Sequence, residues 1–183
     1  TGRGQGVSIL RQASGANLDI MYQFGGEPGT TPKVAYTGAS GITFDGLRSS
    51  NPGGSPVAVV KVYNCEYSSF SDCEFIGGMN RGLWVTAGTA DAGSFPAINR
   101  CNYNFWSNIR IRGNTNGAQF GVVKYNHLVN VLADNNNEGY GLYFFDEGVE
   151  NTQNTLVGCI IQGNGDAAGT KYPGLILQGV ARL

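Results

Sequence analysis

Short apolar runs, rather than a helical period, organise this chain. No 3.6-residue periodicity is sustained, whereas runs rich in β-branched and aromatic residues recur and close with Gly or Asn. The runs are GVSIL (6–10), VAY (34–36), GITF (41–44), PVAVVKV (56–62), GLWV (82–85), IRIR (109–112), FGVV (120–123), GLYFF (141–145), LVGCII (156–161) and GLIL (174–177). They follow one another too closely for helices to fit between them. The pattern therefore predicts an all-β protein.

Four segments of the chain align without gaps. They are FSDCEFIGG, WSNIRIRGN, LVNVLADNN and LVGCIIQGN, which begin with the apolar residues Phe70, Trp106, Leu128 and Leu156. Three residues later stand Cys73, Ile109, Val131 and Cys159, and two further on stand Phe75, Ile111, Ala133 and Ile161. Each copy closes with a pair of turn residues: Gly77-Gly78, Gly113-Asn114, Asn135-Asn136 and Gly163-Asn164.

The spacing of three and then two indicates an apolar residue, a bend, and a strand whose alternate side chains point inward. Gly and Asn suit a left-handed turn, so the closing pairs are expected to stack in a column. The copies follow at steps of 36, 22 and 28 residues, which fits one coil of roughly 20 to 25 residues with loop insertions. A further strand precedes each copy. The repeat predicts a solenoid of stacked three-strand coils, and we expect further sequence or a partner surface to cover the residues after Leu177.

Composition narrows the classes of function. Gly occurs 29 times in 183 residues, hydrophobic residues make up 41% and charged residues 14%, which fits a folded chain rich in sharp turns. We interpret residues 1–183 as one domain. A net charge of −1 and the absence of basic runs argue against nucleic acid, and no apolar run is long enough to insert into a membrane. No signal peptide is recognisable at the start.

The cysteines and the single histidine bear on redox state and metal binding. Cys65, Cys73, Cys101 and Cys159 form no CxxC motif, and His127 is the only histidine, so we expect neither a Cys/His metal site nor a cofactor. Two disulfides are possible. Two of the cysteines fall at aligned core positions, however, which favours reduced and buried thiols.

The opening TGRGQGVSIL, the segment GITFDGL and the repeated units resemble the pectate-lyase-like right-handed parallel β-helix superfamily over essentially the whole chain. Within it, the glycine-punctuated start looks most like bacteriophage tailspike and depolymerase proteins. The resemblance implies a homotrimer, on a virion tail or extracellular, that binds and often cleaves a bacterial surface polysaccharide. It is specific for the fold and unspecific for the chemistry, because the superfamily holds lyases, hydrolases, epimerases and adhesins. Leu132 and Ile160, which alternate outward in neighbouring copies, are a further hint of a subunit contact, unless a loop covers them.

Glycoside hydrolysis needs two carboxyl groups, about 5 to 9.5 Å apart. The densest acidic cluster is Asp146, Glu147 and Glu150, with Asp134 and Glu138 one coil earlier. Our candidate catalytic pair combines Asp134 or Glu138 with Asp146 or Glu147; the alternative is that these acids are solvated loop charges. Arg112 aligns with Asp134 one coil away, and both should point outward. We expect an ion pair along that face, which is either only a solvated pair or a wall of a sugar-binding groove.

Candidate substrate-binding residues are Arg112 and the aromatic residues Trp84, Tyr103, Tyr140 and Tyr143, which lie at strand ends or in insertions where a sugar ring could stack on them. Structural packing is the alternative for each. A polysaccharide lyase would need a base and a cation, for which Lys124, His127, Arg110 and Arg112 are available, although His127 is more typical of a turn residue and no calcium-binding Asp cluster is present.

Two classes of function remain open. One is an enzyme, with a glycoside hydrolase favoured over a secreted polysaccharide lyase. The other is a receptor-binding or structural β-helix of a virion appendage that has no catalytic pair. The long insertion at 86–104 would project as a loop beside the coils and favours a ligand groove without specifying cleavage.

Overall fold

The chain forms parallel β-sheets, and its successive strands belong to different sheets in a repeating order. The computed structural model describes residues 8–16, 18–26, 34–50, 57–87, 101–145, 151–165, 173–178 and 180–182. Apart from one short 3₁₀ turn, η1 (Arg48–Ser50), the regular elements of these residues are strands, and every strand pair among them is parallel. The prediction of an all-β protein is confirmed.

Three main sheets hold one strand from each passage of the chain. The first sheet joins β1 (Ser8–Arg11), β5 (Ile42–Asp45), β9 (Glu74–Ile76), β12 (Arg110–Arg112), β15 (Leu132–Asp134) and β19 (Ile160–Gln162). The second joins β2 (Ile20–Phe24), β6 (Ala58–Tyr63), β10 (Arg81–Thr86), β13 (Asn116–Gly121), β16 (Leu142–Phe145) and β20 (Leu175–Gln178). The third joins β4 (Gly38–Ser40), β8 (Ser69–Ser71), β11 (Phe105–Ser107), β14 (His127–Val129) and β18 (Thr155–Val157).

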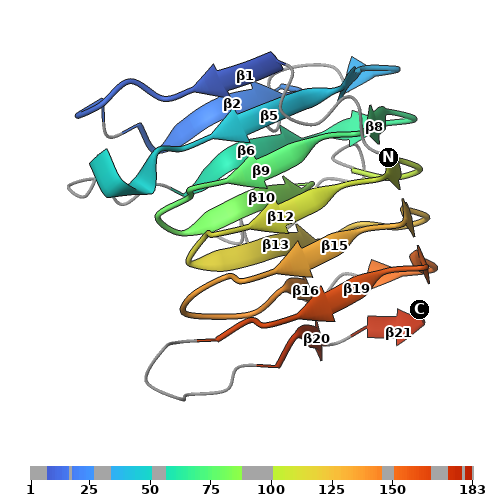
Figure 1. Ribbon diagram of the computed structural model, residues 1–183. Helices are drawn as coiled ribbons and strands as arrows, with labels where there is room; N and C mark the ends of the chain where they lie inside the picture. The colour runs from blue at the N-terminus through green and yellow to red at the C-terminus, as the bar shows by residue number, and fades with distance from the viewer. Residues whose placement is uncertain are drawn as a thin grey trace, which may run out of the picture.

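Two short ladders complete the topology: β3 (Val34–Ala35) pairs with β7 (Cys65–Glu66), and β17 (Asn151–Thr152) pairs with β21 (Val180–Arg182). Along the chain the strands run from the third sheet to the first and then to the second, and each passage lies against the one before (Figure 1). We call one such set of three consecutive strands a rung. Most predicted runs coincide with strands. FGVV does not, because β13 ends at Gly121 and Val122 has a φ of 55°.

The four aligned segments occupy equivalent positions in successive rungs. Phe70, Trp106, Leu128 and Leu156 are register partners in the third sheet. The rings of Phe70 and Trp106 stack with centroids 4.3 Å apart. The inward residues of the first sheet form a second file: Phe75, Ile111, Ala133 and Ile161. The members of these files up to Leu128 and Ala133 are buried, and Leu156 and Ile161 of the last copy are half-buried against the core. The predicted interior pattern is therefore confirmed.

Asparagine side chains connect the rungs at the turns. After the first sheet, Asn136 accepts hydrogen bonds from Asn114 and in turn donates to Asn164. The residue before each of these asparagines has a positive φ, as the closing pairs predicted. A second buried column, which the sequence comparison missed, precedes the third sheet. There the Asn126 backbone N–H and side chain donate to Asn154 Oδ1, and Asn126 Nδ2 also donates to the Cys101 carbonyl.

The last described rung has an exposed inner face. Leu175 and Leu177 are 36% and 45% exposed, whereas their register partners Leu142 and Phe144 are fully buried. Inward apolar residues of a rung need another layer against them. The expectation that something covers the residues after Leu177 stays a prediction.

The cysteines of the described residues are free thiols. Cys65, Cys73 and Cys101 are buried and Cys159 is half-buried, so the reduced alternative is confirmed. Burial raises the pKa of the Cys65 thiol to about 11, and it raises that of Cys101 as well. These thiols pack as small apolar groups.

Candidate functional site

Side chains on the outward face of the first sheet form two columns that cross the rungs, because alternate residues of each strand point away from the core. The first column is Ile9, Thr43, Glu74, Arg110, Leu132 and Ile160. The second is Arg11, Asp45, Ile76, Arg112, Asp134 and Gln162. In the first column the polar residues Thr43, Glu74 and Arg110 lie between apolar ends, whereas the second column is charged or polar except for Ile76.

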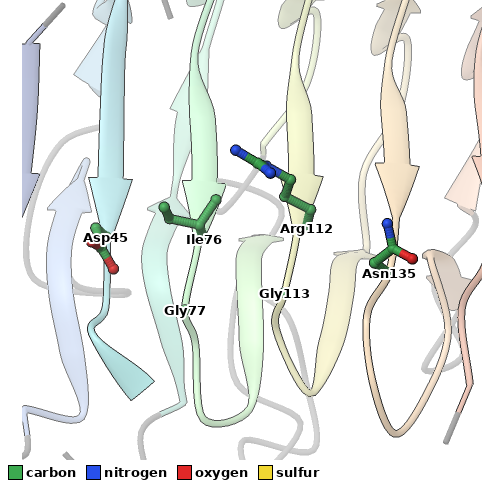
Figure 2. Close-up of a pocket in the computed structure, with 6 residues that line it drawn as sticks. All are labelled: Asp45, Ile76, Gly77, Arg112, Gly113 and Asn135. Carbon is green, nitrogen blue, oxygen red and sulfur yellow. The ribbon is translucent and has the colours of Figure 1, made fainter. Parts of the chain in front are cut away.

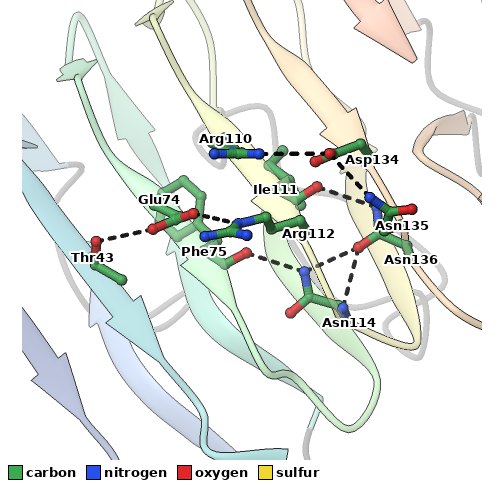
Figure 3. Close-up of polar contacts among 10 residues, drawn as sticks. All are labelled: Thr43, Glu74, Phe75, Arg110, Ile111, Arg112, Asn114, Asp134, Asn135 and Asn136. Atoms are coloured by element: carbon green, nitrogen blue, oxygen red, sulfur yellow. Dashed lines mark hydrogen bonds and ion pairs between the residues drawn. The ribbon is translucent and has the colours of Figure 1, made fainter. Parts of the chain in front are cut away.

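Two diagonal ion pairs cross the middle of the face. Arg112 Nε lies 2.6 Å from Glu74 Oε1, and Arg110 Nη2 lies 3.7 Å from Asp134 Oδ2 (Figure 3). The Thr43 hydroxyl donates to Glu74 Oε2 at 3.2 Å. In each pair the carboxylate side chain is less than a tenth exposed and the arginine is more than a third exposed. The arginines therefore cover the carboxylates.

The expected ion pair between Arg112 and Asp134 is wrong. The two residues are register partners, as the alignment implied, but Arg112 binds Glu74 on the opposite neighbouring strand. Glu74 is 6% exposed, and a buried carboxylate needs a countercharge. Asp134 already faces Arg110 and accepts from Asn135 Nδ2 at 3.2 Å.

A pocket of about 350 Å³ opens where the strands of this sheet pass into their turns. Its lining residues are Asp45, Ile76, Gly77, Arg112, Gly113 and Asn135. The strand that carries Ile76 lies between those of Asp45 and Arg112, and the guanidinium leans toward it (Figure 2). The pocket therefore offers a carboxylate and a guanidinium on either side of an apolar residue.

The turn residues make this pocket possible. Gly77 has a φ of 67°, and a Cβ there would lie 2.9 Å from Asp45 Oδ1, so a larger residue would displace the carboxylate. Asp45 Oδ1 also accepts from the Leu47 backbone N–H at 2.9 Å. Gly113 has a φ of 63° with nothing within 4 Å of the Cβ position. The pocket therefore has no room for a larger residue at Gly77, beside Asp45, but has space at Gly113, beside Arg112.

The candidate acids are only partly placed by the structure. Asp134 lies on the outward face of the first sheet, whereas Glu138 lies in the following turn and forms an ion pair with Arg48. Asp146, Glu147 and Glu150 lie outside the described residues. The pairing of an acid from each group stays a prediction. Asp134 Oδ1 and Arg110 Nε are both buried and have no partner among the described residues.

Three of the four predicted aromatic residues lie together, on the outward face of the second sheet. Trp84 and Tyr143 are both register partners of Gln119. The Tyr140 hydroxyl donates to Gln119 Oε1 at 3.1 Å, and the rings of Tyr140 and Tyr143 lie 5.0 Å apart. Burial raises the pKa of Tyr140, an effect that the charge and hydrogen bond of Arg81 partly oppose.

Tyr103 belongs to a different feature, a column of stacked tyrosines before the third sheet. Its members are Tyr36, Tyr67, Tyr103 and Tyr125, with successive centroids 5.8, 5.0 and 4.7 Å apart. All four have a φ between 51° and 57°. The rings cover one another's faces, so Tyr103 has no free face for a sugar. Sequence reasoning missed the column, although each tyrosine stands three residues before an inward residue of the third sheet.

The residues suggested for a lyase do not gather at one place. Arg110 and Arg112 lie on the first sheet, whereas His127 is an exposed residue of β14 in the third sheet and Lys124 precedes that strand. The prediction that His127 is a turn residue is wrong, since it starts a strand. Its position away from the arginines gives a lyase no assembled base and cation.

The described residues show neither a metal site nor a membrane-spanning helix. In the part of the chain that the structure describes, no group of three or more His, Cys, Asp or Glu residues could hold a metal ion. No helix among those residues is long and apolar enough to cross a membrane. No family model, curated protein or solved structure matches the chain.

Proposed function

We propose that the chain is a segment of a right-handed parallel β-helix of the tailspike kind, which binds a bacterial surface polysaccharide along the outward face of its first sheet. The observation that carries this proposal is the pocket beside Ile76, where a carboxylate and a guanidinium flank an apolar residue. Sugar rings present an apolar C–H face and hydroxyl groups at their edges. Ile76 would contact the apolar C–H face, and Asp45 and Arg112 would form hydrogen bonds with the hydroxyl groups.

The repeat of the face suits a polymer rather than a single sugar. Equivalent positions step from strand to strand by about 4.8 Å, and polar residues continue on both sides of the pocket through Thr43, Arg110 and Asp134. The protein would then bind successive sugar residues with successive rungs. Trimer formation and a location on a virion or outside the cell belong to the same proposal.

Hydrolysis of the bound glycan is the second candidate function. It is favoured by Asp134, a buried carboxylate on this face whose Oδ1 has no hydrogen-bond partner in the part of the chain that the structure describes. An acid and a base about 6.5 to 9.5 Å apart invert the anomeric centre, and a closer pair retains it. The rival to hydrolysis is a receptor-binding protein that holds the polymer without cutting it.

The test is incubation of the full-length protein with capsular and lipopolysaccharide glycans. Binding, new reducing ends and the absorbance of unsaturated uronates separate a binder, a hydrolase and a lyase. We expect Arg112→Gln to weaken binding about ten-fold or more, since hydrogen bonds to a charged group contribute about 1.5–3 kcal/mol. Lys124→Gln, which removes the same charge away from the pocket, should leave binding unchanged. Equal affinity of the two variants would contradict the proposed site.

A further inference from the structure

Arg81 of the second sheet has no carboxylate partner among the described residues. Arg81 donates to Gln119 Oε1 through Nε and to the Val57 carbonyl at 3.2 Å through Nη1, and both acceptors are neutral. The other arginines whose side chains the structure describes each pair with a carboxylate: Arg11, Arg48, Arg110 and Arg112. No carboxylate of the described residues lies within ion-pair distance of Arg81. A half-buried guanidinium in this position is ready to receive an anion.

Trp84 lies beside this guanidinium and has an unused donor. Its ring centroid is 5.3 Å from Arg81 Cζ and 4.7 Å from Lys61 Nζ. Lys61 is only 6% exposed and also lies 3.9 Å from the ring centroid of Tyr63. The indole Nε1–H of Trp84 is buried without an acceptor among the described residues. A buried donor of this kind normally has a partner, so this N–H is an unsatisfied polar group beside Arg81.

Further aromatic residues lie on the same face as Arg81. Trp84, Tyr140 and Tyr143 are each half-buried on this face. Gln119 connects them, since it accepts from both Arg81 and Tyr140. Aromatic rings, a guanidinium and an amide on one face are the groups that recognise a sugar carrying negative charge.

We propose that the outward face of the second sheet around Arg81 and Trp84 binds an anionic substituent of the polysaccharide, a carboxylate or a sulfate. The site rests on the proposed polysaccharide-binding function and deepens it by naming the substrate class, an acidic glycan. It is separate from the pocket of the first sheet, because its residues come from β10, β13, β16 and the residue Tyr140 before β16. Arg81 binds the acidic group, and the aromatic rings pack against the sugar.

The experiment uses a panel of acidic capsular oligosaccharides, each matched with its carboxyl-reduced or desulfated derivative. Binding is measured by titration calorimetry and by tryptophan fluorescence. The chain has two tryptophans, and Trp106 is 1% exposed inside the core, so a change in emission on binding reports Trp84. We expect the acidic form to bind about ten-fold tighter than its neutral derivative, and Arg81→Gln to abolish that preference. Lys124→Gln should retain it.

The outcomes separate this inference from the function on which it rests. Equal binding of acidic and neutral forms, or a preference that survives Arg81→Gln, would overturn the inference while leaving polysaccharide binding intact. Absence of binding to every glycan would refute the proposed function itself. A second measurement uses only the wild-type protein and compares its preference for the acidic over the neutral glycan at low and high salt. Because salt screens charge–charge attraction, a preference that stays unchanged at high salt also refutes the role of Arg81.

Discussion

Replacement of Asn136 by alanine tests whether buried asparagines hold the rungs together. Asn136 is fully buried. Its Oδ1 accepts from the backbone N–H and the side chain of Asn114 at 3.3 and 3.1 Å, and its Nδ2 donates to the Ile111 carbonyl at 3.3 Å and to Asn164 Oδ1 at 2.8 Å. The substitution therefore removes contacts to the rung on either side at once.

The expected loss follows from the groups left behind. The Asn114 side chain keeps its bond to the Phe75 carbonyl, and Asn164 Oδ1 keeps the Asn136 backbone N–H. The Asn114 backbone N–H and the Ile111 carbonyl lose their contacts to the asparagine side chain. A buried polar group without its partner costs about 1–3 kcal/mol, so we expect a loss of about 3 kcal/mol in the free energy of unfolding. With a urea m-value of about 3 kcal/mol/M, the midpoint falls by about 1 M.

The neighbouring residue supplies the control. Asn137 is exposed, and its backbone N–H, rather than its side chain, contacts Asn114. Asn137→Ala should change the free energy of unfolding by less than about 0.5 kcal/mol. The assay is urea denaturation followed by far-ultraviolet circular dichroism. If the two alanine variants unfold at the same urea concentration, the asparagine column does not stabilise the stack and the reasoning is refuted.

Two further predictions concern thiols and glycines. A thiol reagent at pH 8 should modify Cys159 first and the buried cysteines only on unfolding. Because burial raises the pKa of Cys65 from 9.0 to about 11, the unfolded chain loses this proton more readily, and the free energy of unfolding should fall as the pH rises from 9 toward 11; a constant value would contradict this. Gly117→Ala should destabilise by more than about 3 kcal/mol, since the new Cβ would lie 1.9 Å from the Gly141 carbonyl oxygen. Gly113→Ala meets no steric clash and strains only the left-handed φ, so it should lower the free energy of unfolding by about 1–2 kcal/mol. The urea midpoints of the two variants test this difference.

The interior of the fold could be predicted because it obeys a simple geometric rule. A strand alternates its side chains, and a stacked strand repeats its neighbour's environment, so the aligned positions of Trp106, Leu128 and Ile111 had to be apolar. The left-handed turns were predictable where Gly and Asn occupy them. They were not predictable at Tyr36 or Tyr103, because bulky residues rarely adopt a positive φ.

The candidate site was less accessible to sequence reasoning. The register correctly made Arg112 and Asp134 neighbours, but a long arginine side chain can reach either adjacent strand. Its choice of Glu74 depends on how deeply each carboxylate is buried, which the alignment does not contain. Arg81 could not be singled out from the sequence for a related reason: only the positions of the surrounding side chains show that no carboxylate of the described residues reaches it.

The stacked tyrosines have an optical consequence. Four nearly parallel phenol rings, with successive centroids 4.7 to 5.8 Å apart, couple their electronic transitions in a fixed chiral arrangement. The column should therefore give the native protein a strong near-ultraviolet circular dichroism band. Since each ring belongs to a different rung, slippage of a single layer would weaken that band before the backbone signal changes.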